Sequence, residues 1–318
     1  MKLDSSSQSL PKRSELPKID GAPDGAAWFW GQDDELGRLN MLTTGRTASA
    51  AKLIKTGEIV NLNWPAEFPN PPAFGRQGFK HTIQPIGPSG FDDLYDMNTQ
   101  SGSQWDGFRH VGLPHNGKII FYNGLVADDI YKAESGGMQA WADHGIAGRG
   151  VLIDYWDYAG KSYDPITTHR ITLSDIHAIA KKHGIEFQYG DILIIRSGFT
   201  ENYVSLDEKQ RAHLGTLKIP EHAFVGVEQT EDMLDFLHDN YFSAVVGDAP
   251  AFEAWPRQSI NLHQYLLTRW GVPIGEMWDL DQLAETCKRK NQYAFFVASV
   301  PTNVRGGVGS HPNAIAIF

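Results

Sequence analysis

The densest group of polar side chains lies at residues 98–110, which read Asn-Thr-Gln-Ser-Gly-Ser-Gln-Trp-Asp-Gly-Phe-Arg-His. Gly102 and Gly107 disfavour a helix here, and in an extended chain alternate side chains share one face. That face would carry Gln100, Gln104, Asp106 and His110. A carboxylate between amide oxygens suits a hard divalent cation, and a nearby imidazole suits proton transfer. The segment is therefore a candidate catalytic site; the alternative is a hydrogen-bonded turn with a structural histidine.

Three side chains within the same segment are candidates for binding a substrate. Trp105 and Phe108 would line the pocket, although core packing is the commoner role for any one tryptophan in a chain that contains nine. Arg109 has the charge to hold a substrate carboxylate or to pair with an acidic side chain, and we favour the pair.

The elements that must position these residues are of both kinds. Apolar and β-branched runs predict strands, and apolar residues at helical spacing predict helices. The expected strands are residues 58–63, 118–123, 150–155, 191–197, 243–247, 294–300 and 314–318. The expected helices are residues 44–55, 172–184, 230–238, 259–270 and 279–290. Residues 63–88, with six prolines and three glycines, predict a long irregular excursion of the kind that often covers a site. The class is mixed α/β.

Composition excludes several classes of function. The chain has 318 residues, 28 Lys and Arg against 38 Asp and Glu, and a net charge of −10, so a nucleic-acid partner is not expected. A single cysteine, Cys287, excludes an internal disulfide framework and fits a reducing, cytoplasmic location. The chain has no glycine-rich nucleotide-binding motif and no serine-hydrolase elbow, so no nucleotide cofactor is expected.

The organisation expected along the chain is simple. Residues 1–25 mix Lys, Asp, Ser and Pro and predict a flexible N-terminal arm, and residues 26–318 predict one domain without an internal repeat. No stretch approaches 18 consecutive apolar residues, so no association with a membrane is expected.

Four separated motifs resemble the cyclase family, which includes bacterial kynurenine formamidases and isatin hydrolases. Residues 102–110 resemble the family's His-x-Gly-Thr-His-x-Asp-x-Pro-x-His signature without gaps, and residues 190–198 resemble its Gly-Asp-x-Leu-Leu-x-Arg-Thr-Gly strand. Residues 261–263 with 273–280 resemble the segment that supplies a late His and Glu as metal ligands, and residues 301–312 resemble its glycine-rich loop. The resemblance implies a swivelling β/β/α fold, with a mixed sheet and flanking helices, and a homo-oligomer (dimer or tetramer).

The resemblance also implies a metal site, from which this chain departs. Where the family has two metal-binding histidines, this chain has Gln100 and Gln104, and Phe108 replaces a proline. Asp106 and His110 match the signature, and His263 and Glu276 match the late ligands. Amide oxygens bind zinc weakly and favour manganese or magnesium, so the site either holds one of these three ions or has lost its metal.

The expected activity is hydrolysis of a small cyclic or aryl amide, or of a lactone. In this interpretation Gln100, Gln104, Asp106, His263 and Glu276 hold the metal, and His110 is the general acid and base. One alternative is a metal-free lyase, dehydratase or cyclase that acts on a secondary metabolite, with His110 and Asp106 as the acid–base pair. A second alternative is a protein that binds a small molecule without turning it over.

Overall fold

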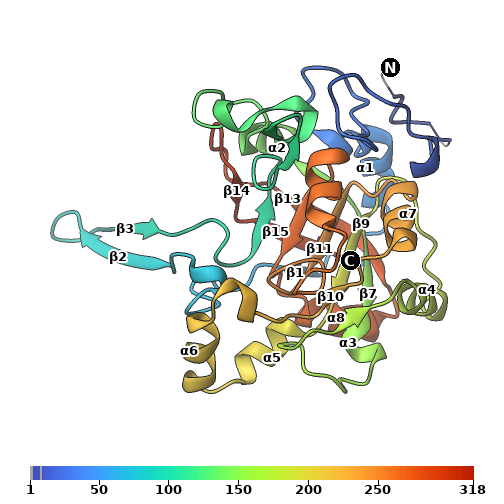
Figure 1. Ribbon diagram of the computed structural model, residues 1–318. Helices are drawn as coiled ribbons and strands as arrows, with labels where there is room; N and C mark the ends of the chain where they lie inside the picture. Colours follow the sequence, from blue (N-terminus) through green and yellow to red (C-terminus); the bar gives the residue numbers. More distant parts are fainter. Residues whose placement is uncertain (1–2, 8) are drawn as a thin grey trace.

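Nine strands form the central sheet of the computed structural model, which describes residues 3–7 and 9–318 (Figure 1). Their order is β1 (Ile59–Asn61), β15 (Ala314–Ile317), β13 (Ala294–Ser299), β7 (Ile146–Asp154), β9 (Ile192–Arg196), β11 (Ala244–Gly247), β12 (Ile274–Glu276), β4 (Gln104–Asp106) and β14 (Gly309–Ser310). Strands β7, β9, β11 and β12 run parallel, whereas the remaining neighbours pair antiparallel. The mixed α/β prediction is confirmed.

The parallel strands form the apolar centre of the molecule. Every residue of β9, β11 and β12 is buried, as expected for strands that are covered on both faces. The runs predicted at residues 150–155, 191–197, 243–247, 294–300 and 314–318 all lie in this sheet, together with the run at 58–63. The run at 118–123 instead forms β6 (Lys118–Ile120), which pairs with β5 (Leu113–His115) in a small hairpin outside the sheet.

Helices flank the sheet and bury their apolar stripes against it. Helix α4 (Leu173–Lys182) begins at a capping box formed by Thr172 and Asp175, and it buries Ile176 and Ile179. The other helices are α1 (Thr44–Ala51), α2 (Met138–His144), α3 (Tyr155–Tyr158), α5 (Phe199–Ser205), α6 (Glu208–Thr216), α7 (Glu231–Asp239) and α8 (Asp281–Lys290). The helix predicted over 259–270 is shorter, a π-helical segment at Gln264–Arg269.

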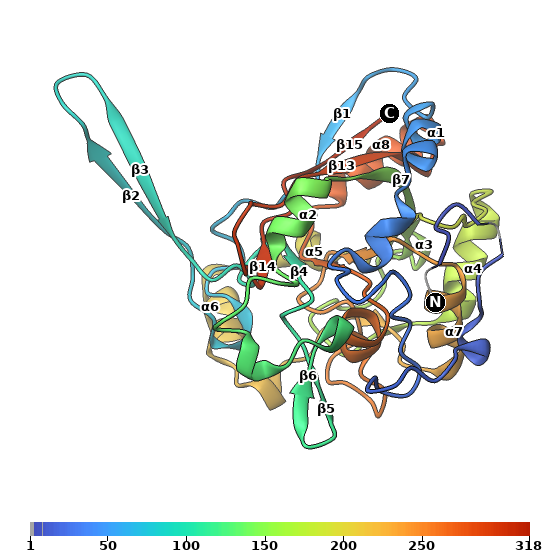
Figure 2. The same cartoon turned by 90° about the horizontal axis from the view of Figure 1, so that it is seen from above.

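The irregular excursion of residues 63–88 ends in a strand that the sequence does not predict. Strand β2 (Lys80–Pro85) pairs antiparallel with β3 (Phe91–Asp96), and every residue of both strands is exposed. Figure 2 shows this hairpin extending far from the rest of the molecule. It contributes nothing to the central sheet.

The N-terminal segment lies against the body through specific contacts. The Arg13 side chain pairs with Glu231 and Asp235 of α7, the Tyr241 hydroxyl donates to the Pro11 carbonyl at 2.7 Å, and Leu10 is buried. Its flexibility in solution stays a prediction. Within the described part of the chain, none of the helices has the length and apolar character needed to cross a membrane.

Candidate active site

Two adjacent strands supply the centre of the site. Strands β4 and β12 pair antiparallel, with Gln104 opposite Glu276, and directly opposite side chains share one face of a sheet. Asp106, two residues after Gln104, points to the same face. Gln104 Nε2 lies 2.8 Å from Asp106 Oδ1 and 3.0 Å from Glu276 Oε2, and all three residues are buried. The alternation predicted from the sequence therefore holds for Gln104 and Asp106, and the pairing of β4 with β12 adds Glu276 to their face.

Turns, and not a continuous strand, bring in the other two residues of the polar segment. A turn in which Ser101 N donates to the Asn98 carbonyl places Gln100 Oε1 2.7 Å from Gln104 Nε2. A second turn, closed by His110 N donating to the Gly107 carbonyl, places His110 Nε2 3.8 Å from Asp106 Oδ2. The structure thus brings Gln100, Gln104, Asp106 and His110 together, although the extended strand is only three residues long.

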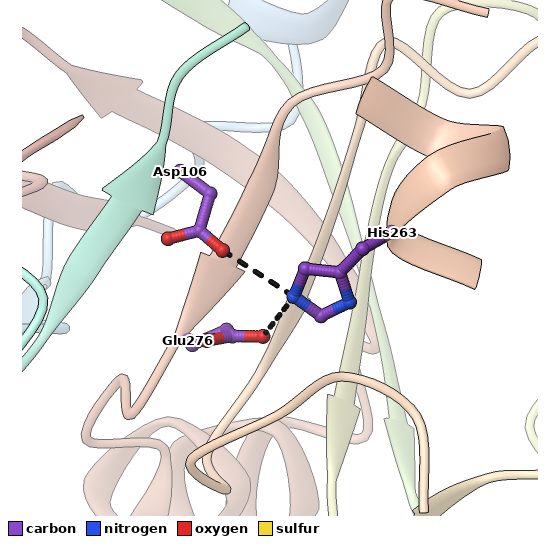
Figure 3. A group of neighbouring side chains, drawn as sticks. All are labelled: Asp106, His263 and Glu276. Atoms are coloured by element: carbon purple, nitrogen blue, oxygen red, sulfur yellow. Dashed lines mark ion pairs between the residues drawn. The ribbon is translucent and has the colours of Figure 1, made fainter. Parts of the chain in front are cut away.

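His263 joins the two carboxylates from a different part of the fold. It lies at the N-terminal end of the π-helical segment, and its Nε2 is 3.1 Å from Glu276 Oε1 and 3.5 Å from Asp106 Oδ2 (Figure 3). One ligand atom from each of these three residues lies within 4.8 Å of the others. Residues about 150 positions apart in the sequence therefore converge on one point.

A third carboxylate, which the sequence analysis missed, lies behind His263. Glu253 is fully buried, and its Oε2 accepts a hydrogen bond from His263 Nδ1 at 2.6 Å. This bond fixes which ring nitrogen faces Asp106 and Glu276, as is usual for histidines that bind metals. Glu253 follows the Asp248-Ala-Pro turn after β11, and its position beyond a buried strand is the only sequence signal that points to it.

The ionisation of these groups is strongly interdependent. Burial opposes the charge on His263, but Glu253, Asp106 and Glu276 outweigh this effect and raise the pKa of the imidazole well above its ordinary value. Burial and the Asp106 carboxylate raise the pKa of Glu276 to about 7. The pKa of Asp106 lies below its ordinary value because His110 and His263 outweigh the effect of burial. The site therefore holds an excess of negative charge around one imidazolium.

His110 has the opposite tendency. Burial lowers the pKa of its imidazole, and the charges of His263 and Arg76 add to this effect against the pull of Asp106. A neutral imidazole can accept a proton. The His110 side chain is 18% exposed and that of His263 is 12% exposed, whereas those of Asp106 and Glu276 are at most 2% exposed, so the site is reached from the side of the two histidines.

Arg76 is the second residue that sequence reasoning missed. It lies in the excursion of residues 63–88, and its Nη1 donates to the Gln100 carbonyl at 2.7 Å. Its positive charge acts on Asp106, His110 and Glu276. The sequence analysis expected residues 63–88 to cover a site, and Arg76 lies in that segment. Nothing in the local sequence pattern identified this arginine in particular.

The donor set fits a divalent cation. A carboxylate oxygen from Asp106, another from Glu276 and His263 Nε2 converge, and this mixed set is one that zinc or manganese accepts. Asp106 Oδ2 is buried, and among the described residues no hydrogen-bond partner lies closer to it than His263 Nε2 at 3.5 Å. A cation would satisfy this oxygen. The roles of these residues as ligands and of His110 as a base stay predictions.

The structure does not support the three substrate-binding assignments. Trp105 points to the opposite face of β4, where it is fully buried, stacks edge-on against Trp278 and donates to Ser299 Oγ at 2.9 Å. Phe108 packs in the core, and Arg109 is buried and donates to the Ile130 carbonyl. For Trp105 the physical reason is side-chain alternation: it lies between Gln104 and Asp106 in β4, so its side chain takes the opposite face. Phe108 and Arg109 lie beyond the end of β4, where alternation no longer applies.

Comparisons with solved structures agree with this fold. A structure described as a novel cyclase superposes with a TM-score of 0.80 and 29% identity, covering 91% of this chain and 98% of that one. Isatin hydrolase A from Ralstonia solanacearum gives a TM-score of 0.58 at 14% identity, covering 87% and 98%. Isatin hydrolase A from Labrenzia aggregata, bound to benzyl benzoate, gives 0.57 at 15% identity with the same coverage. A search of curated protein sequences found no match.

The sequence itself also matches a family model. The model described as "Putative cyclase" matches residues 42–254, which include Gln100, Gln104, Asp106, His110 and Glu253. The match covers more than half of the chain and agrees with the resemblance seen in its four motifs. The chain therefore belongs to the cyclase family.

Proposed function

We propose that the protein is a hydrolase of a small cyclic or aryl amide, or of a lactone, and that a divalent metal ion assists it. The observation that carries this proposal is the convergence of Asp106, His263 and Glu276 within 4.8 Å, beside a partly exposed His110 whose pKa is lowered by burial. Two structural neighbours named isatin hydrolases motivate the choice of an amide substrate, although their low identity speaks only for the fold.

His110 is the residue placed to move protons. Its neutral Nε2 would take a proton from the water that adds to the substrate carbonyl, and it would return that proton to the nitrogen or oxygen that leaves when the bond breaks. Asp106, 3.8 Å away, stabilises the imidazolium between these two events. A divalent ion held by Asp106, His263 and Glu276 would supply polarisation of the carbonyl and a more acidic bound water.

The rival is a metal-free lyase, dehydratase or cyclase with His110 and Asp106 as the acid–base pair. One observation favours it: the Gln104 amide nitrogen donates to the carboxylates of both Asp106 and Glu276. In this reading the carboxylates already have donors, and the imidazole alone does the proton chemistry.

Metal analysis and turnover together test the proposal. Protein purified without chelator is expected to carry manganese, zinc or magnesium, and to hydrolyse at least one member of a panel of aryl formamides, cyclic amides and lactones. Asp106→Asn keeps the shape of the side chain and removes its charge, so it should abolish both the metal and the turnover while the circular dichroism spectrum stays unchanged. Turnover that survives in Asp106→Asn would contradict the proposal, and a wild type that binds panel compounds without turnover would identify a binding protein.

A further inference from the structure

We propose that the paired carboxamides of Gln100 and Gln104 are a two-position device that lets one site exist both with and without a cation. With the Gln104 nitrogen turned toward the carboxylates, the amide occupies the place of a cation. With the Gln104 oxygen turned toward them, the site binds a hard divalent ion. This inference rests on the proposed metal site and adds how this chain loads it.

The first observation is the crowding of acceptors around one nitrogen. Gln104 Nε2 lies 2.7 Å from Gln100 Oε1, 2.8 Å from Asp106 Oδ1 and 3.0 Å from Glu276 Oε2. A primary amide nitrogen carries two hydrogens, so three acceptors share two donors. Three oxygens that converge on one point, two of them from carboxylates, form the surroundings that a cation requires.

The second observation is that the same arrangement leaves both amides half satisfied. Gln104 Oε1 and Gln100 Nε2 are buried, and neither has a hydrogen-bond partner among the described residues. A buried polar atom without a hydrogen bond costs free energy. The position with the Gln104 nitrogen toward the carboxylates is therefore destabilised by these two atoms. The position with the Gln104 oxygen inward puts Gln104 Nε2 and Gln100 Oε1 into the same two places, so this penalty is common to both positions and does not hold the amides in either one.

Each amide can rotate by half a turn without needing additional volume. Rotation about the last side-chain bond exchanges an oxygen and a nitrogen of similar size, which is why the two orientations fill the same volume. The Gln100 amide is closely confined: a Cβ built on Gly309 would lie only 2.2 Å from Gln100 Nε2. This confinement allows the isosteric half-turn and prevents the side chain from moving away.

Turning both amides supplies three oxygen ligands, from Gln104 and from the oxygens of the same two carboxylates that do not face His263. Gln100 Nε2 then donates to Gln104 Oε1, so the pair stays hydrogen-bonded, while Gln104 Nε2 and Gln100 Oε1 move to the two places without partners. Gln104 Oε1, Asp106 Oδ1 and Glu276 Oε2 become three oxygens with no proton between them, at spacings of 2.8 and 3.0 Å from the Gln104 atom. Adjacent ligands of an octahedral ion with bonds of ~2.1 Å lie about 3.0 Å apart, so the spacing already fits Mg²⁺ or Mn²⁺.

The consequence is a weak and reversible site that favours hard cations. Cation binding must replace the amide hydrogens that serve the carboxylates, so affinity is lower than for a site of preformed ligands. When the ion leaves, the Gln104 nitrogen turns back and donates to Asp106 and Glu276, so these carboxylates are not left without a donor. A neutral amide oxygen also discriminates against zinc in favour of magnesium and manganese.

The test observes the amide itself on the full chain. We would follow side-chain amide signals by ¹H–¹⁵N NMR in protein labelled on glutamine, with Mg²⁺ alone as the probe, and assign Gln104 by its loss in Gln104→Glu. The signals of Gln100 and Gln104 should shift on addition of Mg²⁺, with the same midpoint that calorimetry gives for binding. Gln229 is the matched control, because its buried amide already donates to the Ala254 carbonyl and accepts from Gln258 N, so its signal should stay fixed.

A second measurement uses the charge of the substitution. Gln104→Glu removes the inward donor and supplies a fixed oxygen, so it should bind Mg²⁺ at least about tenfold more tightly than the wild type does. Binding of Mg²⁺ without any shift of the Gln104 signal would overturn the inference and leave the proposed function standing, as would an affinity that Gln104→Glu does not raise. If Zn²⁺ binds the folded wild type but neither Mg²⁺ nor Mn²⁺ does, the inference fails and the proposed metal site stands; if none of the three ions binds, the proposed metal site itself fails. If Gln104→Glu does not fold, the NMR measurement on the wild type decides alone, with the signals assigned through Gln100→Glu.

Discussion

Glu253→Gln is the substitution that tests the arrangement behind His263. The side chain is fully buried, and its Oε2 lies 2.6 Å from His263 Nδ1. Glutamine keeps the shape and an acceptor for this hydrogen bond, but it removes the negative charge. The charge matters because it contributes most to raising the pKa of His263, whereas burial acts to lower that pKa. It therefore strengthens the electron-donating power of the opposite ring nitrogen, Nε2.

The expected effect can be sized from this contact. A hydrogen-bond partner behind a metal-binding histidine contributes about 10- to 100-fold in metal affinity, which is about 1.4 to 2.7 kcal/mol. We expect the upper part of this range, because the bond is short, joins two ionised groups and is buried. Stability should change little, since three carboxylates already crowd one imidazole and the loss of one charge relieves part of their repulsion.

Equilibrium dialysis against Mn²⁺ measures this effect directly. Wild type and Glu253→Gln should differ by about 30- to 100-fold in the dissociation constant, with similar unfolding midpoints in urea. Glu228→Gln is the control, because that carboxylate only accepts a hydrogen bond from Leu173 N at the start of α4. Equal Mn²⁺ affinity in wild type and Glu253→Gln would refute the reasoning, since His263 would then not be tuned by its neighbour.

Three further predictions concern the buried His238, the β2–β3 hairpin and the two glutamines of the site. Burial, with the charge of Arg38 second, lowers the pKa of His238 to about 4 from 6.5, so between these values the unfolded chain takes up a proton that the folded chain excludes, and stability falls as the pH falls. His238→Gln should remove about 2.4 kcal/mol of the loss in unfolding free energy between pH 7 and pH 4.5, measured in urea, and an unchanged loss would contradict this assignment. Ile83, Phe91 and Tyr95 share one face of the β2–β3 hairpin and are 63–72% exposed, so Ile83→Asp with Phe91→Asp should lower the mass of the expected homo-oligomer in light scattering, whereas Thr82→Asp with Gln84→Asp on the opposite face should not. Gln100→His with Gln104→His should retain zinc through dialysis where the wild type loses it, and a folded double variant without zinc would show that His263 and Glu276 are not poised as ligands.

The sequence predicted the centre of the sheet better than its margins. Strands β9 and β11 are continuous apolar runs, so burial on both faces leaves a clear signal. Strands β2 and β3 were missed because a hairpin that projects from the body has no buried face, and its sequence therefore lacks alternation. Strand β12 is only three residues long, and its middle residue is Gly275, which weakens any strand pattern.

The site was predictable only where its residues are close in sequence or carry a family motif. Gln104 and Asp106 follow from alternation, and the same rule places Trp105 on the core face, against the assignment to substrate binding. His263 and Glu276 were reached through the resemblance, because convergence across about 150 residues depends on the whole fold. Glu253 and Arg76 belong to no recognised pattern and became visible through their contacts with His263 and Gln100.

The most direct test of the central claim measures metal occupancy and turnover on the same sample. Protein stripped with chelator is titrated with Mn²⁺ by equilibrium dialysis, and each fraction is assayed for hydrolysis of the panel compound that the untreated protein turns over fastest. A site made of Asp106, His263 and Glu276 predicts one ion per chain and a rate that rises in proportion to occupancy. Full activity in protein that contains no metal and takes up none would contradict the account.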